Sequence, residues 1–283
     1  MRHETDELAG GDGVALFRQC WYPDGEVAGV AVLAHGLAEH SGRYRGLAER
    51  LTERGFALHA FDMRGHGRSP GHRCYVADFG ALIDDLARAI DSARRRHPSL
   101  CLALIGHSFG GAVALATVLE RPTLTDLLVL SAPAVAADPD VPRTRLLLGK
   151  LLSKLRPRAG ILRLPAAAVS RDPLVVRSYE EDPLVYRGSI PARTLVGLLA
   201  TMRRIEVQAG ELRPPTLVLH GTEDRLVPLR FNHRVYERLG AADLTIRLYD
   251  GFYHEVFNEP GRREVLGDLE AWLSARALPG TRA

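Results

Sequence analysis

Short runs of apolar residues recur along the chain, and most of them end at a glycine or a polar residue. Runs bounded by turn residues in this way are typical of strands buried on both faces of a sheet. Between the runs, apolar residues recur at helical spacing and predict amphipathic helices. One such stripe consists of Phe79, Leu82, Ile83, Leu86 and Ile90. Strands are expected at residues 27–34, 56–61, 102–105, 127–130, 216–219 and 244–249.

Strands that alternate with helices predict an α/β fold, in which helices cover both faces of a mostly parallel sheet. Residues 1–23 differ, because their apolar and polar positions alternate roughly, as in a two-stranded ribbon at a sheet edge. Ligands of a parallel sheet gather at the carboxyl ends of its strands. The loops that follow the strands are therefore the places to look for chemistry.

The strands at residues 127–130 and 216–219 are separated by roughly eighty residues, where a connection usually takes only a handful. We therefore expect residues 1–133 and 214–283 to form the core and residues 134–213 to form an inserted helical cap.

One helix of the expected cap has two interpretations. Its apolar face carries Leu148, Leu151, Leu152 and Leu155, and Lys150 and Lys154 lie on the opposite side. Such a helix is suited to resting on a lipid surface, which would give the protein a peripheral membrane contact. The alternative is a cap helix packed against its own domain.

Composition narrows the class of protein. Hydrophobic residues make up 46% of the chain and charged residues 25%, which predicts a sizeable core. A net charge of +3, from 37 basic and 34 acidic residues, argues against a nucleic-acid partner. The charged start of the chain and the lack of any apolar run near ~18 residues favour a cytoplasmic protein. Cys20, Cys74 and Cys101 have no metal-site spacing, and we expect no metal and no cofactor.

The most informative stretch is Gly106-His107-Ser108-Phe109-Gly110, which lies between a predicted strand and a predicted helix. A Gly-x-Ser-x-Gly sequence in this context is the nucleophile elbow of serine hydrolases, although it also occurs in ordinary glycine-rich turns. Ser108 is therefore the candidate nucleophile. The backbone N–H of Phe109, at the helix N-terminus, is a candidate donor to an oxyanion.

A serine hydroxyl reacts only when a base removes its proton and a carboxylate orients that base. In this type of fold, the acid and then the histidine follow the serine along the chain. Asp224, just beyond a predicted strand, is favoured over Glu223 as the acid. His254, which follows the last strand, is favoured over His220 and His233 as the base.

The loop that begins at His35 and Gly36 is the expected source of the second oxyanion donor, the backbone N–H of Leu37. The alternative is a plain strand-to-helix loop.

These motifs together resemble the monoacylglycerol lipase family of α/β-hydrolases, over most of the chain and least in the expected cap. The matching stretches are His35-Gly36 with Glu39-His40-Ser41-Gly42-Arg43-Tyr44, Asp62 with Arg64-Gly65-His66-Gly67-Arg68-Ser69, Gly106-His107-Ser108 with Gly110-Gly111, Asp182-Pro183-Leu184, His220-Gly221 with Asp224-Arg225-Leu226, and Tyr253-His254.

The resemblance implies an α/β-hydrolase fold and hydrolysis of monoacylglycerol to glycerol and a free fatty acid through an acyl-enzyme. It also implies that the cap is a lid over an acyl tunnel and that Arg43 and Tyr179 lie near the glycerol head group. One departure is Ala38, where many family members have glycine. A lysophospholipase, a general carboxylesterase and a catalytically silent binding protein of the same fold remain as alternatives.

Overall fold

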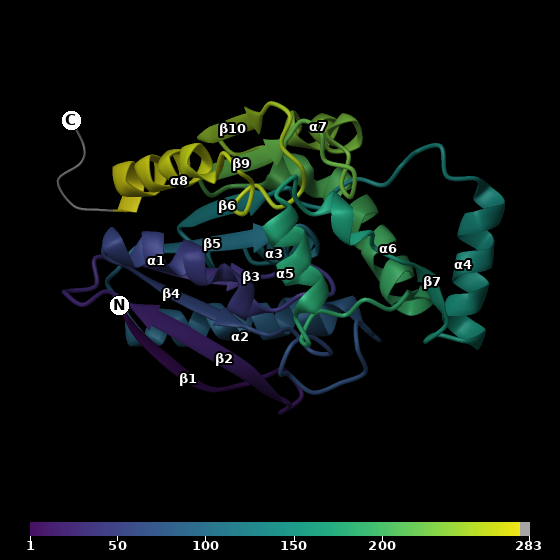
Figure 1. The fold of residues 1–283 in the computed structure, drawn as a ribbon, viewed down its shortest axis with the longest axis horizontal. Helices are drawn as coiled ribbons and strands as arrows, with labels where there is room; N and C mark the ends of the chain where they lie inside the picture. Colours follow the sequence, from purple (N-terminus) through teal and green to yellow (C-terminus); the bar gives the residue numbers. More distant parts are fainter. Residues whose placement is uncertain (278–283) are drawn as a thin grey trace.

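The computed structural model describes residues 1–277 and has an α/β architecture (Figure 1). Within these residues the main sheet has eight strands, in the order β1-β2-β4-β3-β5-β6-β9-β10. β1 pairs with β2 and β2 with β4 in antiparallel fashion, and all other neighbours are parallel. The strand bounds are β1 (Arg2–Ala9), β2 (Ala15–Tyr22), β3 (Gly29–Ala34), β4 (Phe56–Phe61), β5 (Leu102–His107), β6 (Leu127–Ser131), β9 (Thr216–Gly221) and β10 (Leu244–Tyr249).

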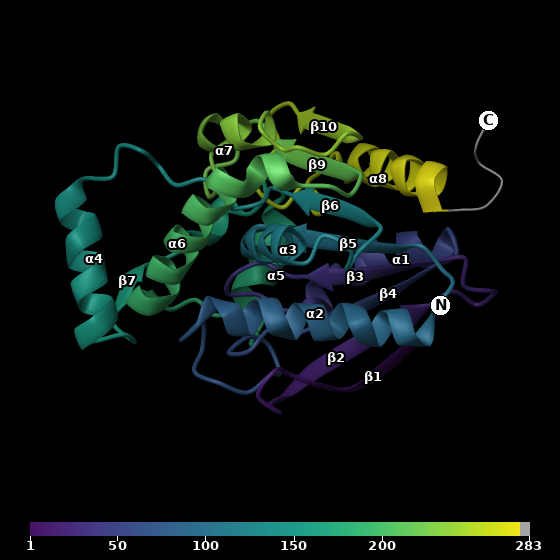
Figure 2. The same cartoon turned by 180° about the vertical axis from the view of Figure 1, so that it is seen from behind.

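Helices cover both faces of the sheet, as the sequence pattern predicts (Figures 1 and 2). α1 and α8 contribute to the apolar core on one face, and α2, α3, α6 and α7 to the core on the other. Their bounds are α1 (Arg45–Glu53), α2 (Phe79–Arg96), α3 (Phe109–Glu120), α6 (Ala192–Gln208), α7 (Leu229–Tyr236) and α8 (Arg262–Ala277).

The centre of the molecule is formed by β5 and α3. All six residues of β5 are buried, and every residue of α3 except Glu120 is buried. A helix that is apolar all round has no solvent face, which explains why residues 112–119 show a continuous apolar run and no amphipathic stripe. The connection between β5 and α3, where Ser108 lies, is therefore held by the most deeply packed part of the fold.

Residues 132–215 connect β6 to β9, which are neighbours in the sheet. α6 packs against α3 and α2, and α4 packs against α6. Of this segment the sequence pattern indicated only the first helix; it did not indicate the small antiparallel sheet or the second and third helices. Besides α6, the segment contains α4 (Arg143–Leu155), β7 (Gly160–Leu162), the 3₁₀ helix η2 (Ala166–Ala168), α5 (Pro173–Glu181), β8 (Ile190–Pro191) and the 3₁₀ helix η3 (Ala209–Glu211).

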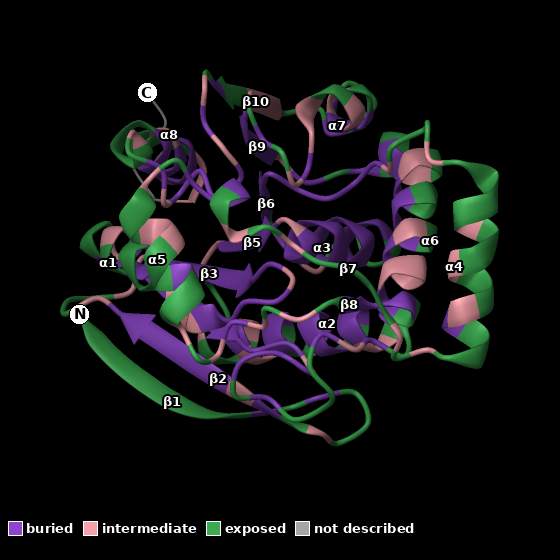
Figure 3. Cartoon of the chain, turned by 45° about the vertical axis from the view of Figure 1, so that its right-hand side comes forward, coloured by how far each residue is buried: buried purple, intermediate pink, exposed green. Residues whose placement is uncertain are grey.

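α4 stands at the edge of the molecule, beyond α6, and most of its surface is exposed (Figure 3). Leu148, Leu151 and Leu155 of the predicted apolar face are 56%, 53% and 72% exposed, and Leu147 beside them is 65% exposed. Only Leu152 of that face is half-buried. The interpretation that this face packs against its own domain is therefore wrong for most of its length.

The approach of α3 to the sheet depends on Gly110. A Cβ atom at this position would collide with the carbonyl oxygens of Ala34 and His35, at the end of β3. Because these are backbone atoms in the centre of the sheet, they have no room to move aside.

Gly110→Ala is therefore expected to lower the free energy of unfolding by about 2–3 kcal/mol, although alanine is ordinarily the better helix former. Urea unfolding measures the change. Gly267→Ala is the matched control, because Gly267 lies in α8 with open space around it, and this change should stabilise by up to about 1 kcal/mol. A Gly110→Ala variant as stable as the parent would contradict the packing argument.

Candidate active site

Ser108 occupies a strained turn between β5 and α3. Its backbone has φ 53° and ψ −117°, a region that residues with a side chain rarely adopt. Hydrogen bonds hold this conformation in place: the Ser108 N–H donates to the Ser131 carbonyl (2.9 Å), and its own carbonyl accepts from the N–H groups of Ala112 (3.1 Å) and Ala134 (3.0 Å). The strand–turn–helix geometry is that of a nucleophile elbow.

Asp224 and His254 form a buried pair in the loops that follow β9 and β10. His254 Nδ1 lies 2.7 Å from Asp224 Oδ2, while Asp224 Oδ1 accepts from the backbone N–H groups of Leu226 (2.9 Å) and Val227 (2.8 Å). The second histidine near the carboxylate is His220, whose Nε2 is 3.2 Å from Asp224 Oδ2.

Charge determines the protonation of this pair. Burial by itself would raise the pKa of Asp224, but the charge of His254 and hydrogen bonds from both histidines hold that pKa well below its usual range. Burial would likewise lower the pKa of His254, but the Asp224 carboxylate outweighs it and raises this pKa above its usual 6.5. Asp224 is thus ionised, and His254 is a stronger base than an ordinary histidine.

The loops that follow β9 and β10 touch because of Gly221, the last residue of β9. A Cβ atom there would collide with the carbonyl oxygens of Phe252 and Tyr253. The absence of a side chain lets the backbone of one loop lie against the other, which brings the carboxylate of Asp224 within reach of His254.

Ser108 and His254 line the same cavity, which has a volume of about 790 Å³. The His254 ring also lies 4.7 Å, centroid to centroid, from the ring of His107, the residue that precedes the serine. Leu37 and Phe109, the first residue of α3, belong to the same cavity lining. Much of the remaining wall is apolar and comes from residues 134–213, including Leu146, Ile161, Leu162, Leu195, Leu199 and Met202.

The chain as a whole is similar to known proteins. A family model described as serine aminopeptidase, S33, matches residues 25–261. A monoacylglycerol lipase of Mycolicibacterium smegmatis is 40% identical over 269 residues, which cover 94% of this chain and 95% of that protein. A human monoglyceride lipase is 34% identical over 282 residues, or 98% of this chain and 93% of that protein.

The chain belongs to the monoacylglycerol lipase family. Its fold agrees with this assignment. The crystal structure of a monoacylglycerol lipase from Paleococcus ferrophilus superposes with a TM-score of 0.82 at 33% identity, covering 93% of this chain and 99% of that one. A Saccharomyces cerevisiae monoglyceride lipase, solved with a substrate analogue, has the same fold, with a TM-score of 0.86 at 21% identity over 97% of this chain and 95% of that one. The chain is thus a carboxylic ester hydrolase with the α/β-hydrolase fold.

The loop after β3 is held by a buried carboxylate. Glu39 accepts from the N–H of Gly36 (2.5 Å) and the hydroxyl of Tyr44 (2.6 Å) through Oε1. Burial opposes its charge, but Arg43 and the neighbouring histidines hold the pKa of Glu39 at about 2. Ala38 has φ 68°, so this alanine adopts the left-handed conformation at a cost of about 1–2 kcal/mol.

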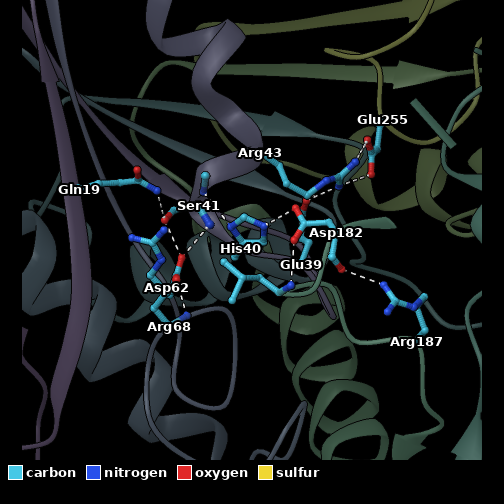
Figure 4. A network of polar contacts seen from close by, with 12 residues as sticks. Gln19, Glu39, His40, Ser41, Arg43, Asp62, Arg68, Asp182, Arg187 and Glu255 are labelled. Carbon is cyan, nitrogen blue, oxygen red and sulfur yellow. Dashed lines mark hydrogen bonds and ion pairs between the residues drawn. The ribbon is translucent and has the colours of Figure 1, made fainter. Parts of the chain in front are cut away.

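Arg43 and Tyr179, the residues expected near a head group, contact each other. The Arg43 guanidinium lies 4.9 Å from the centre of the Tyr179 ring, and it pairs with Glu39 (2.6 Å) and with both carboxylate oxygens of Glu255 (2.6 and 2.8 Å) (Figure 4). Tyr179, Glu39 and Glu255 line the cavity that contains Ser108. Arg43 lies behind them and lines a separate cleft.

A further polar contact joins this loop to the segment between β6 and β9. His40 Nε2 lies 2.9 Å from Asp182 Oδ2, and Asp182 Oδ1 accepts from the N–H of Leu184 at 2.8 Å (Figure 4). Ser41, the next residue of this loop, is bonded to Asp62: Asp62 Oδ1 accepts from its N–H and its hydroxyl, at 2.8 and 2.6 Å. Several of the motif residues that carry the resemblance thus position the loop and need not contact substrate.

Of the competing candidates, His220 lies beside Asp224, and the other two are at the surface. Glu223 is exposed, and His233, on α7, is 3.5 Å from Glu237 at the surface. No helix among residues 1–277 is long and apolar enough to cross a membrane, and the same residues contain no histidine, cysteine and carboxylate cluster suited to a metal ion.

Asp224→Asn is expected to lower the pKa of His254, because it removes the negative charge that favours the imidazolium. Titration of the histidine ring signals by nuclear magnetic resonance measures the change. Asp138→Asn is the control, since Asp138 also lines the cavity but has no contact with His254, and it should leave the titration where it was. An unchanged His254 titration in Asp224→Asn would refute the electrostatic coupling.

Proposed function

We propose that the protein hydrolyses monoacylglycerol to glycerol and a free fatty acid, with Ser108 as nucleophile, His254 as general base and Asp224 as the acid that orients it. The observation that carries this proposal is the Asp224–His254 hydrogen bond of 2.7 Å on the wall of the cavity into which the strained Ser108 turn opens. Family membership supports the ester substrate, since relatives named monoacylglycerol lipase match almost the full chain.

The reaction proceeds in two steps. His254 Nε2 takes the Ser108 proton while Oγ attacks the ester carbonyl, and the oxyanion accepts hydrogen bonds from the N–H groups of Leu37 and Phe109. The intermediate collapses to an acyl-enzyme as the glycerol oxygen leaves with the proton from His254. A water molecule, deprotonated by His254, then attacks the acyl-enzyme, which releases the fatty acid and restores the Ser108 hydroxyl.

The cavity lining combines apolar side chains with polar groups, which fits a monoester of glycerol. Its apolar wall is suited to an acyl chain. Tyr179 and the carboxylates of Glu39 and Glu255 offer hydrogen-bond partners for glycerol hydroxyls, and Arg43 holds these groups from behind. Residues 134–213 provide most of the apolar wall, so we assign them the role of a lid over the acyl chain.

Ser108→Ala tests this assignment. The variant should lose labelling by a fluorophosphonate and lower monoacylglycerol hydrolysis by about 10³-fold or more, because no other group replaces the nucleophile. Ser99→Ala, in an exposed turn remote from the cavity, serves as the control and should behave like the parent. Undiminished labelling of Ser108→Ala would rule out the proposed nucleophile.

The substrate is tested separately by comparing kcat/KM for monoacylglycerol, diacylglycerol and lysophospholipid of one acyl chain. The proposal expects monoacylglycerol to be preferred. A preference for lysophospholipid, or equal activity on unrelated short esters, would replace the proposed substrate while leaving the triad in place.

We further propose that α4 docks on an anionic lipid surface. Its exposed leucines form an apolar strip, and basic residues flank it along the helix and in the segment that follows: Arg143, Arg145, Lys150, Lys154, Arg156 and Arg158. An apolar face that inserts among acyl chains and basic side chains that meet lipid phosphates are the two features of an interfacial helix. α4 packs on α6, whose side chains line the cavity, so docking there places the cavity beside the lipid.

The double variant Leu148→Asp/Leu151→Asp should bind vesicles containing phosphatidylglycerol at least about tenfold more weakly, because it places two charges in the inserted face. Co-sedimentation with vesicles measures binding, and hydrolysis of a dispersed short-chain ester checks that the site is intact. Val207→Asp is the matched control, as Val207 is 80% exposed on the same segment but outside α4. Equal binding of parent and double variant would exclude this helix as the docking surface.

A further inference from the structure

His220 is the last residue but one of β9, and its side chain is completely buried beneath Asp224. Its Nε2 lies 2.9 Å from the Val227 carbonyl oxygen and 3.2 Å from Asp224 Oδ2. Its Nδ1 lies 2.7 Å from the hydroxyl of Tyr236, in α7. Both ring nitrogens are therefore in hydrogen-bonding contact, although the sequence suggested His220 only as a weaker candidate for the base.

These contacts determine which nitrogen of a neutral His220 carries the proton. Nε2 faces two oxygen atoms that only accept hydrogen bonds, so a bare lone pair there would be repelled by both. The proton must be on Nε2, and Nδ1 must accept. Tyr236 is the donor to Nδ1, because burial, followed by the charge of Asp224, raises the pKa of Tyr236 well above its usual value and keeps the hydroxyl protonated.

We propose that His220 is a positioning residue of the catalytic triad: its Nε2–H holds Asp224 Oδ2 in line with His254, and the Tyr236 hydroxyl fixes the tautomer that makes this hydrogen bond possible. The inference rests on the proposed triad and extends it by two residues. Tyr236, His220, Asp224 and His254 then form one directed chain of donors and acceptors, with every member at least nine-tenths buried.

Leu226 and Val227 donate to Asp224 Oδ1, and His254 donates to Oδ2. The Nε2–H of His220 is shared: its shorter contact is with the Val227 carbonyl oxygen (2.9 Å), and Asp224 Oδ2, at 3.2 Å, is its second acceptor. The backbone donors hold Oδ1, and rotation of the carboxyl group about its Cβ–Cγ bond would carry Oδ2 away from His254. A second donor on Oδ2 opposes this rotation, so the direction in which Nδ1 of His254 is held depends on His220.

His220 also competes with His254 for the charge on Oδ2. Without the Nε2–H donor, more of that charge faces His254, whose pKa would rise further. The other titratable groups that act on His254 are Glu39, Glu255 and His107. Burial, followed by the charge of His254, lowers the pKa of His107 to about 3. His107 therefore stays neutral and does not contribute to a pH–rate profile measured near neutral pH.

Three substitutions separate these roles. His220→Leu removes the donor to Asp224, His220→Gln supplies an amide N–H in its place, and Tyr236→Phe removes the group that fixes the tautomer. The rate of labelling of Ser108 by a fluorophosphonate is measured against pH, together with kcat and KM for a p-nitrophenyl ester. Labelling reports on the triad whatever the natural ester, so a failure of the proposed substrate leaves this test intact.

His220→Leu is expected to lower the labelling rate and kcat by about ten- to a hundredfold, the range for loss of a hydrogen bond to a charged group, with KM within about twofold. The acidic limb of its profile of labelling rate against pH should move to higher pH, because the pKa of His254 rises. His220→Gln should restore most of the rate and the position of the limb. Undiminished labelling of His220→Leu, or a Gln variant as impaired as the Leu variant, would overturn the proposal.

Tyr236→Phe keeps the test decisive even where the leucine variant does not fold. It should lower the rate of Ser108 labelling several-fold when residue 220 is histidine. It should have no further effect when residue 220 is glutamine, because an amide group donates its N–H without a neighbour that fixes its tautomer. Equal losses in the two backgrounds would mean that Tyr236 acts only as a core residue, and the inference would fail.

Discussion

A negative charge buried at the end of β9 is the constraint that most of this site satisfies. An ionised carboxylate is strongly disfavoured away from water unless hydrogen bonds and opposite charges surround it. Asp224 has backbone donors from its own loop, a histidine from the loop after β10 and a second histidine from β9. These donors meet only when β9, the loops after β9 and β10, and α7 are all in their native positions. Burial of this one charge therefore depends on the correct packing of the carboxyl end of the sheet.

A second buried acid organises the opposite side of the cavity in the same way. Glu39 fixes the loop that carries Leu37, and Arg43 balances both this acid and Glu255. The result is that the charges of Glu39, Glu255 and Arg43 are paired with one another beside the cavity, while the insertion supplies many of the apolar residues that line it. Pairing of this kind offsets the cost of burying these charges.

The sequence predicts the fold class, most of the sheet and the three residues of the proposed triad, because these depend on local patterns and on chain order. Ser108 lies in a motif whose flanking strand and helix are readable, and Asp224 and His254 each follow an apolar strand. The residues that the sequence could not assign act through distant partners. Nothing near His220 in the chain reveals that Tyr236 lies against it, and nothing near Gly221 reveals that the loop after β10 crosses there.

The insertion shows the same limit. Its length was readable, but β7 and β8 are only three and two residues long, too short for a strand pattern to show, and α5 is a short helix of nine residues. The apolar face of α4 allowed two interpretations, and only its position at the edge of the molecule decided between solvent and core (Figure 3).

The insertion is anchored to the core except at α4. Val169, Asp182 and Tyr186 are bonded to the core, at Glu255, His40 and Ala38 respectively, and α6 packs against α3 and α2, whereas α4 packs chiefly on α6. Over evolutionary time the anchored part is therefore restricted to changes that preserve these contacts, while the outer helix is free to diverge. Related enzymes that meet different acyl chains or different surfaces can accordingly acquire that variety by exchanging α4, with the machinery beneath it left as it is.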